Sequence, residues 1–271
     1  METYREFLKF DRWQEWREHD TDQRKGLPDP PLQKPYPQGE RATLIDLVPP
    51  GDLTVGQMPL IEAIRRRRSR REYTDEPLTL QELSFLLWAT QGIDERATRA
   101  FGDWLATKDP TIVGRATLRT VPSAGGRHPF ETYLLVHRVR GLEPGLYRYL
   151  SVEHKLLFLR TGGAGTELTE QVARAFMRWV HRSAVVFIWA TIPYRMEWRY
   201  SIFAPKMIAQ ESGHVCQNLY LASEAIGAGT CAIMYDQAQV DRILGVDGVD
   251  EFAIYVAPLG KVAPAEYHFD H

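Results

Sequence analysis

Arginine dominates one short segment of the sequence. Six of the seven residues from Arg65 to Arg71 are arginine, with Ser69 among them, and the apolar residues Leu60, Ile61 and Ile64 come just before. In a continuous helix, arginines four residues apart would repel one another, at a cost of about a few tenths of a kcal/mol per pair. A segment that carries this cost indicates an anion-binding site, and a phosphate group is an anion that fits.

A solvated basic face or a nucleic-acid patch is the other interpretation of such a run. The whole chain has 33 Lys and Arg against 35 Asp and Glu, which gives a formal net charge of −2. Nucleic-acid-binding domains usually carry a broad basic stripe. The charge balance therefore favours a small anionic cofactor over a polyanion, and we expect no nucleic-acid partner.

A second segment, Val121–Phe130, is rich in small residues and reads Val-Pro-Ser-Ala-Gly-Gly-Arg-His-Pro-Phe. The small side chains of Ser123–Gly126 would let a ligand ring approach the backbone and would leave N–H groups free to donate. An ordinary turn at the entry to a strand is the alternative that composition leaves open. By itself, His128 is expected to be a surface or capping histidine.

Two further glycine-rich strings match nucleotide-binding patterns only in part. The string Thr161–Thr166 is followed by Leu168 where the third glycine of the dinucleotide pattern would stand. The string Gly227–Ala232 matches that pattern but follows a predicted helix, whereas the pattern requires a preceding strand. We interpret the first string as a turn and the second as the end of a helix.

Cysteine, histidine and amide side chains in the second half of the chain are expected to be structural. Cys216 and Cys231 lack the paired spacing of zinc or redox sites, so we expect two small buried side chains and no metal. His214 lies in a helical pattern of small residues, where a core histidine is expected and a catalytic acid is the alternative. Gln217 and Asn218 are expected to form hydrogen bonds within the core.

Local patterns predict the elements that position these segments. Thr79–Glu82 is a capping box that begins a helix, and Gly92 is placed to end it. Residues 94–119 are polar and predict a mobile loop or a short irregular helix. Beyond them we expect an antiparallel meander at 132–139, 146–149 and 156–159, a helix at 168–180, a buried strand at 184–191, a long helix at 205–226, a short helix at 239–244 and a last strand at 252–257. The lack of strict βαβ alternation predicts an α+β fold.

Residues 1–57 are expected to form an N-terminal proline-rich extension to a domain over residues 58–271. The extension begins with Trp13 and Trp16 among charged residues and continues with five closely spaced prolines, Pro28, Pro30, Pro31, Pro35 and Pro37. Proline at this density disfavours helix and sheet. We expect the extension to lie along the domain or along a partner subunit, with a disordered linker as the alternative.

The composition is that of a globular protein. The chain has 271 residues, of which 44% are hydrophobic, enough to bury a sizeable core. The apolar run Ala184–Ala190 is far shorter than the roughly 20 residues that cross a bilayer, and the charged start Met1–Glu6 has no apolar signal-peptide region. We therefore expect a cytoplasmic protein without membrane association.

Five ordered motifs over residues 58–262 resemble the FMN-dependent nitroreductase family, and more narrowly its SagB-type branch, which includes azoline oxidases of peptide-modifying clusters. The motifs are Arg67–Tyr73 with Pro77–Thr79 and Leu87–Gly92, then Pro122–His128, Gly145–Tyr149, Glu211–Leu219, and Gly227–Ile233 with Pro258–Lys261. The resemblance implies a central mixed sheet, rich in antiparallel pairs and flanked by helices, in an intertwined homodimer. It leaves the N-terminal extension outside the match.

The resemblance also implies which residues bind FMN. Phosphate, ribityl chain and ring edge would be bound by Arg67, Arg68, Ser69 and Arg71, with Lys261 as a second phosphate contact. Four residues of the other subunit would lie against the isoalloxazine ring: Pro122, Ser123, Ala124 and Gly125. Ile233 and Met234 would lie near flavin N5, where the family commonly offers a backbone N–H.

The candidate catalytic residues depart from the azoline oxidase pattern. Those enzymes are thought to use a Lys-Tyr pair after a Trp, and here Trp198 is followed by Arg199 and Tyr200. Arginine stays protonated and is a poor general base, so Tyr200 is expected to act at most as a proton donor. A packing or hydrogen-bonding role for both residues is the alternative.

The resemblance therefore predicts an FMN-dependent oxidoreductase that reduces a small oxidised acceptor, such as a nitroaromatic or a quinone, with NAD(P)H in a ping-pong flavin cycle. One alternative is a SagB-type dehydrogenase that oxidises an azoline or related bond in a peptide, with oxygen as acceptor. The other alternative is a flavin-binding scaffold within a modifying complex.

Overall fold

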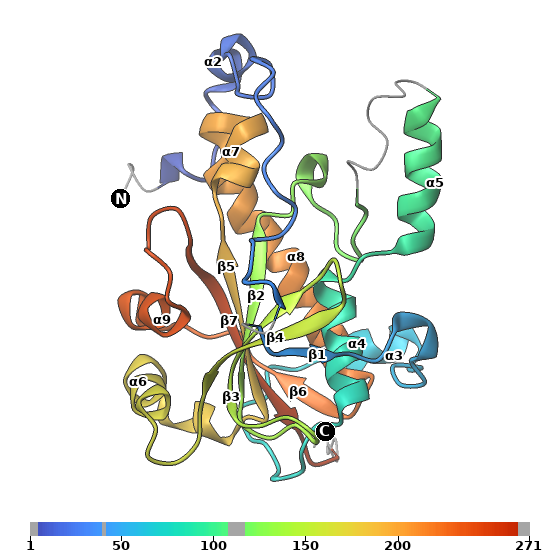
Figure 1. Ribbon diagram of the computed structural model, residues 1–271, viewed down its shortest axis with the longest axis vertical. Coiled ribbons are helices and arrows are strands. Elements are labelled where there is room, and N and C mark those ends of the chain that lie inside the picture. Colours follow the sequence, from blue (N-terminus) through green and yellow to red (C-terminus); the bar gives the residue numbers. More distant parts are fainter. Residues whose placement is uncertain (1–4, 40–41, 108–116, 265–271) are drawn as a thin grey trace, which may run out of the picture.

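A seven-stranded sheet forms the centre of the computed structural model, which describes residues 5–39, 42–107 and 117–264. The strand order is β1-β4-β3-β2-β5-β7-β6 (Figure 1). The strands are β1 (Leu44–Asp46), β2 (Phe130–Val136), β3 (Gly145–Leu150), β4 (Lys155–Thr161), β5 (Val185–Thr191), β6 (Ala228–Thr230) and β7 (Phe252–Lys261). Every neighbouring pair is antiparallel. The predicted α+β fold is confirmed, but the sheet is antiparallel where a mixed sheet was expected, because hairpins and returning connections join its strands.

Helices cover both faces of this sheet (Figure 1). On one face, α4 (Leu80–Gln91) and α8 (Ala204–Glu224) pack over side chains such as Leu134 and Phe187. On the other face, α6 (Glu167–Ala175) and α9 (Gln237–Leu244) pack over the alternating neighbours of those residues. Because successive side chains of a strand point to opposite faces, the same strands contribute to two separate cores. The remaining helices are α2 (Trp13–Glu18), α3 (Leu60–Arg66), α5 (Glu95–Ala106) and α7 (Tyr194–Tyr200), with short 3₁₀ turns η2 (Pro50–Asp52), η4 (Ala124–Gly126), η5 (Arg178–Arg182) and η6 (Ser201–Phe203).

Several elements have the signals that the sequence predicts. The capping box is present, because the Thr79 hydroxyl accepts from the Glu82 N–H while the Glu82 carboxylate accepts from the Thr79 N–H, and α4 ends before Gly92. The antiparallel meander is confirmed in β2, β3 and β4. The strand at 184–191 is fully buried as β5. Cys216 and Cys231 are both buried and free.

Other elements differ from the prediction. A regular helix, α5, replaces the loop or irregular helix expected after residue 94, and residues 108–116 of that stretch lie outside the described ranges. The helix predicted at 168–180 ends at Ala175, because Phe176 has an extended backbone with φ −129°. Helix α7 was not predicted at all. Among the described residues, no helix is long and apolar enough to cross a membrane.

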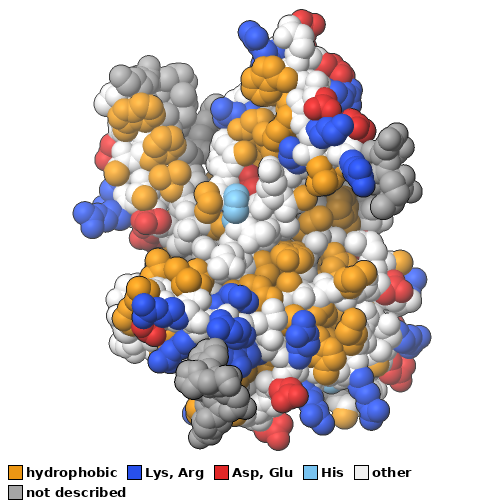
Figure 2. Space-filling view, turned by 180° about the vertical axis from the view of Figure 1, so that it is seen from behind, with side chains coloured by type: hydrophobic (Ala, Val, Ile, Leu, Met, Phe, Trp, Pro, Cys, Tyr) orange, Lys and Arg blue, Asp and Glu red, His pale blue; other side chains and the backbone are white. Residues whose placement is uncertain are grey.

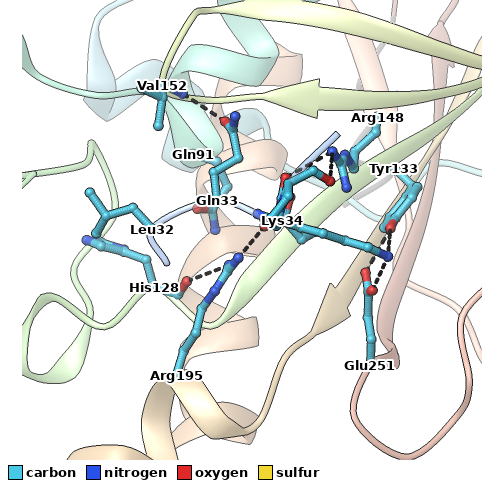
Figure 3. A network of polar contacts seen from close by, with 12 residues as sticks. Leu32, Gln33, Lys34, Gln91, His128, Tyr133, Arg148, Val152, Arg195 and Glu251 are labelled. Carbon is cyan, nitrogen blue, oxygen red and sulfur yellow. Dashed lines mark hydrogen bonds and ion pairs between the residues drawn. The ribbon is translucent and has the colours of Figure 1, made fainter. Parts of the chain in front are cut away.

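The N-terminal extension lies along the domain of its own chain. A segment that we call the strap, residues 31–36, crosses the sheet beside a network of buried charges (Figure 3). The strap residue Lys34 donates its backbone N–H to Glu131 at 2.7 Å and forms an ion pair with Glu251. Arg148 donates to the carbonyls of Lys34 and Pro35 at 3.0 and 3.2 Å. The sheet therefore holds the strap by both its backbone and its side chains.

An aromatic cluster holds the first part of the extension. Phe10, Trp13 and Trp16 pack on Phe203, with ring centroids 4.8–6.4 Å apart. Trp16 also stacks on Tyr200 at 6.5 Å. The extension thus covers one side of a candidate catalytic residue.

Candidate functional site

The arginine-rich segment leaves α3 and joins the edge of the sheet. Helix α3 ends at Arg66, and Arg67 has the non-helical dihedral angles φ −48° and ψ 119°. Ser69 then pairs with Thr230 of β6, and the Arg70 N–H donates to the Thr230 carbonyl at 3.0 Å. The segment is therefore extended, and the repulsion of a helical arginine run is avoided.

Tyr220 of α8 gathers the side chains of this segment. The Arg67 guanidinium lies 5.6 Å from the centroid of the Tyr220 ring, and the Ser69 hydroxyl lies 3.4 Å from the Tyr220 hydroxyl. The same hydroxyl accepts a hydrogen bond from the Ala232 N–H at 2.9 Å. Sequence reasoning missed Tyr220, although a tyrosine on a helix of small residues needs a partner for its hydroxyl.

The other predicted phosphate ligands lie at the surface near this group. Arg68 is exposed and donates to the carbonyls of Arg65 and Arg67 at 3.0 and 2.8 Å. Arg71 is exposed as well. Figure 2 shows the face behind the view of Figure 1, where basic side chains lie beside hydrophobic ones. The exposed guanidinium groups can therefore reach a ligand at the surface.

Lys261 lies at the end of β7 and is already engaged. Its ammonium group forms an ion pair with Glu82 of the capping box and donates to the Ile226 carbonyl at 2.6 Å. Both charged side chains are nearly buried, with 11% and 12% exposed. An ammonium group has three N–H donors, and Glu82 and Ile226 take two of those of Lys261. A phosphate contact from Lys261 stays a prediction, and it would have to use the third N–H donor.

The two residues predicted near flavin N5 differ in what they offer. The Ile233 N–H donates to the Val256 carbonyl at 3.0 Å, so it is not available to a ligand. Met234 is 84% exposed, and its N–H has no backbone partner among the described residues. Of the two backbone groups, only that of Met234 is free to donate.

The loop at Pro122–Gly125 has a strained and tightly held shape. Gly125 and Gly126 have φ of 60° and 65°, which favours glycine, and His128 has φ of 44°. The Ser123 hydroxyl accepts from the His128 N–H at 2.8 Å, and the Ala124 N–H donates to Glu211 of α8 at 2.6 Å. These hydrogen bonds hold the loop against α8 shortly before β2 begins at Phe130.

Two histidines are placed differently from the sequence-based expectation. His128 is buried, not at the surface, and burial lowers its pKa to about 3. His214 is exposed on α8, so the expected core position is wrong, and Gln217 is exposed beside it. Asn218 does bond within the core, because its amide donates to the Ala89 carbonyl of α4 at 2.8 Å.

The candidate catalytic residues lie against the strained loop. A Cβ added at Gly125 would come within 2.7 Å of the Tyr200 hydroxyl and 3.0 Å of Cδ of Arg199. The Arg199 guanidinium lies over the Tyr200 ring at 5.6 Å. Helix α7 therefore brings both side chains to the loop, where only glycine leaves room for them.

The structure separates the predicted site into two groups along α8. The loop group, Pro122–Gly125 with Arg199 and Tyr200, is contacted by Glu211 through Ala124. The arginine group, Arg67 and Ser69 with their exposed neighbours, is contacted by Tyr220. Nine residues of α-helix rise about 13.5 Å. Within a single chain, the two groups therefore lie at different levels of the same helix.

Comparison with known proteins agrees with this architecture. The family described as the nitroreductase family matches residues 64–261. A protein of Methanocaldococcus jannaschii that is assigned as a nitroreductase is 32% identical over 220 residues, which cover 78% of this chain and 98% of the relative. The chain belongs to the nitroreductase family, as the motifs predict, and is thus of the oxidoreductase class.

Solved structures share the fold. One is a protein of Ralstonia eutropha, assigned as a nitroreductase, with 24% identity, a TM-score of 0.62, and coverage of 88% of this chain and 100% of that chain. Another belongs to the Escherichia coli microcin synthetase McbBCD complex, with 19% identity, a TM-score of 0.54, and coverage of 81% and 79%. At these identities, the likeness extends to the fold alone.

Proposed function

We propose that this chain binds FMN through its arginine-rich segment. The observation that carries the proposal is the group formed by Arg67, Ser69, Tyr220 and Ala232, which lies beside exposed guanidinium groups. A phosphate monoester needs cations and donors in a fixed arrangement, and extended backbone at a sheet edge provides one. The free N–H of Met234 is a donor suited to the ring.

We further propose that the ring is completed by the Pro122–Gly125 loop of a second copy of the chain, in a homodimer. Support comes from the roughly 13.5 Å of α8 that separate the two groups within one chain. The apolar side chains of α3, Leu60, Ile61 and Ile64, are between 56% and 64% exposed beside the arginine group. Apolar side chains gathered on one exposed helix are typical of a surface that a partner covers.

The activity we propose is reduction of a small oxidised acceptor, of nitroaromatic or quinone type, in the cytoplasm. When bound, FMN supplies a two-electron carrier that takes hydride from NAD(P)H and passes it to the acceptor. The chain's own part is to neutralise the phosphate with Arg67, Arg68 and Arg71 and to hold the ring by backbone groups. Tyr200 can donate a proton to an acceptor at the loop, whereas Arg199 stays protonated and supplies charge.

A second candidate, oxidation of an azoline or related bond in a peptide, rests on the contact of Arg199 and Tyr200 with Gly125. A proton acceptor is missing from this pair, because arginine does not act as a general base. The third candidate is a flavin-binding scaffold in a modifying complex. Such a chain would bind FMN through the same arginines but would not catalyse a reaction.

Anaerobic mixing of the FMN-loaded protein with NADH or NADPH separates the reductase from the other two candidates. Rapid loss of the yellow flavin absorbance, followed by its return on addition of a nitroaromatic or a quinone, is the expected result for the reductase. A flavin that stays oxidised with both nicotinamides contradicts the reductase and is the result expected for both the peptide oxidase and the scaffold. Purified protein without yellow absorbance and without affinity for added FMN would contradict the whole proposal.

A further inference from the structure

Glu211 is a buried carboxylate to which the proposed flavin chemistry assigns no role. It lies in the first half of α8 and is 4% exposed. Its Oε1 accepts from the Ala124 N–H at 2.6 Å, and the Ser123 side chain lies near enough to favour the charged form of the carboxylate. Among the described residues, no cationic side chain forms an ion pair with Glu211. Among the described residues, the polar groups that contact the Glu211 carboxylate all belong to the Pro122–Gly125 loop.

A carboxylate in this position is costly for the fold. Burial disfavours the charged form and raises the pKa of Glu211, and only a backbone N–H and a hydroxyl oppose this effect. Buried charges without a cation are poor sources of stability. A role in placing its partners therefore explains Glu211 better than a contribution to stability does.

The partners of Glu211 need such placement. The loop combines positive φ at Gly125, Gly126 and His128 with a close approach of Gly125 to Tyr200. For a residue other than glycine, such as His128, a positive φ persists only where surrounding groups determine it. Glu211 fixes the beginning of the loop from α8, while Tyr200 packs against its middle from α7.

We propose that Glu211 is a positioning residue of the flavin site, whose carboxylate fixes Ser123 and Ala124 so that the Pro122–Gly125 loop presents one rigid backbone surface to the isoalloxazine ring. This inference rests on the proposed function. In the proposed homodimer, Glu211 serves the flavin whose phosphate is bound by the other subunit, while Tyr220, further along the same helix, serves the flavin of its own subunit.

The comparison of FMN with riboflavin tests this role, because the two ligands differ only in the phosphate. In the full-length protein, Glu211→Ala is expected to weaken both ligands by the same factor, about tenfold, because it disturbs the contact with the ring. The variant with Arg67→Ala and Arg71→Ala is expected to weaken FMN alone. Glu211→Gln retains one acceptor for the Ala124 N–H and should lose less affinity than Glu211→Ala.

The visible circular dichroism of the bound flavin reports on the ring directly. It should change in Glu211→Ala and return toward that of the unsubstituted protein in Glu211→Gln. A folded Glu211→Ala protein with unchanged riboflavin affinity and an unchanged flavin spectrum would overturn the role of Glu211. FMN binding that depends on the arginines in the same series would leave the proposed function intact, whereas an unsubstituted protein that binds neither flavin would overturn both.

Asp241 provides a matched control for a purely structural effect. It is a buried carboxylate, 7% exposed, and accepts from the Ala253 backbone N–H at 2.7 Å on the opposite face of the sheet. Asp241→Asn should lower the thermal midpoint without altering the flavin spectrum or the affinity for riboflavin. Equal spectral changes in Asp241→Asn and Glu211→Ala would show that Glu211 acts only through stability and would overturn the proposal.

Mixed dimers test on which flavin Glu211 acts. One subunit carries Arg67→Ala with Arg71→Ala, the other carries Glu211→Ala, and two affinity tags isolate the mixed species. If Glu211 serves the flavin bound by the other subunit's arginines, one site receives all the substitutions and the second site receives none. The expected result is half the flavin content, with the affinity of the unsubstituted protein. Loss of every tight site would overturn this placement.

Discussion

The hydroxyl of Tyr220 accepts a hydrogen bond from the backbone N–H of Ala232, 2.9 Å away, while the ring of the same side chain lies under the guanidinium of Arg67. One side chain of α8 thus connects the arginine-rich segment with the backbone that leads to Ile233 and Met234. The distance between the predicted phosphate ligands and the predicted ring donor therefore depends on this tyrosine.

Tyr220→Phe is expected to weaken FMN binding about fivefold, because it removes the acceptor for the Ala232 N–H and the contact with Ser69 but keeps the ring beneath Arg67. Tyr220→Leu should lose more, because the cation–π contact is also removed. Fluorescence titration with FMN measures both. Equal affinity in all three proteins would contradict the role assigned to Tyr220.

The double variant Arg67→Ala, Arg71→Ala should bind FMN about 100-fold more weakly, because two charge-assisted contacts to the phosphate are removed. Its affinity should also lose most of its dependence on salt concentration. Arg65→Ala is the control, since Arg65 pairs with Glu62 at 3.0 Å on exposed α3. Unchanged FMN affinity in the double variant would remove the phosphate assignment.

Neutralising Glu82 should destabilise the fold by about 3 kcal/mol, because Glu82→Gln leaves the nearly buried ammonium of Lys261 without its counter-charge. Urea unfolding followed by circular dichroism gives the free energy of unfolding. Glu62→Gln, which breaks the exposed pair with Arg65, should change the stability by less than about 1 kcal/mol. Similar losses in both variants would contradict the importance of burial for the Lys261 pair.

The free energy of unfolding should decrease as the pH is lowered below neutrality, because two histidines are buried. Burial lowers the pKa of His128 to about 3 and that of His137 to about 4, against an ordinary value of 6.5. As the pH falls, the histidines of the unfolded chain therefore take up protons before those of the folded protein. The contribution of each histidine to the free energy of unfolding is complete above pH 6.5 and is lost as the pH falls toward its pKa in the folded protein. Each adds a slope of about 1.4 kcal/mol per pH unit in that window.

His128→Asn is the informative variant, since asparagine tolerates the positive φ of 44° found there. Its free energy of unfolding, measured in urea from about pH 4 to about pH 7, should depend less steeply on pH than that of the unsubstituted protein. Parallel curves for the two proteins would show that His128 does not titrate differently in the folded and unfolded states.

Local signals in the sequence were sufficient for much of the fold. Thr79 and Glu82 contain the whole information for a capping box within four residues, and the apolar run of β5 needs no distant partner to be recognised. Helix α7 was missed because Tyr194–Tyr200 mixes charged and aromatic residues, and its packing against the N-terminal extension, through contacts such as Trp198 Nε1 with the Leu27 carbonyl, is invisible to local patterns.

The candidate site was predictable as far as residue types identify it. The arginine segment and the small-residue loop are visible as strings, but their supports are not, because Tyr220 and Glu211 contact residues 151 and 87 positions away. His214 shows the opposite error. Small neighbours suggested a core position, yet the helix turns that side chain outward.

The ion pair between Lys34 and Glu251 joins residues 217 positions apart in the chain. During synthesis, the strap leaves the ribosome long before the loop at Glu251 exists, so this ion pair cannot form until 217 further residues have been added. Contacts of such long sequence separation form late in folding. Chains that stop before residue 251 should therefore hold the strap only through residues such as Glu131 and Arg148, and should expose their N-terminal arm more readily to proteases.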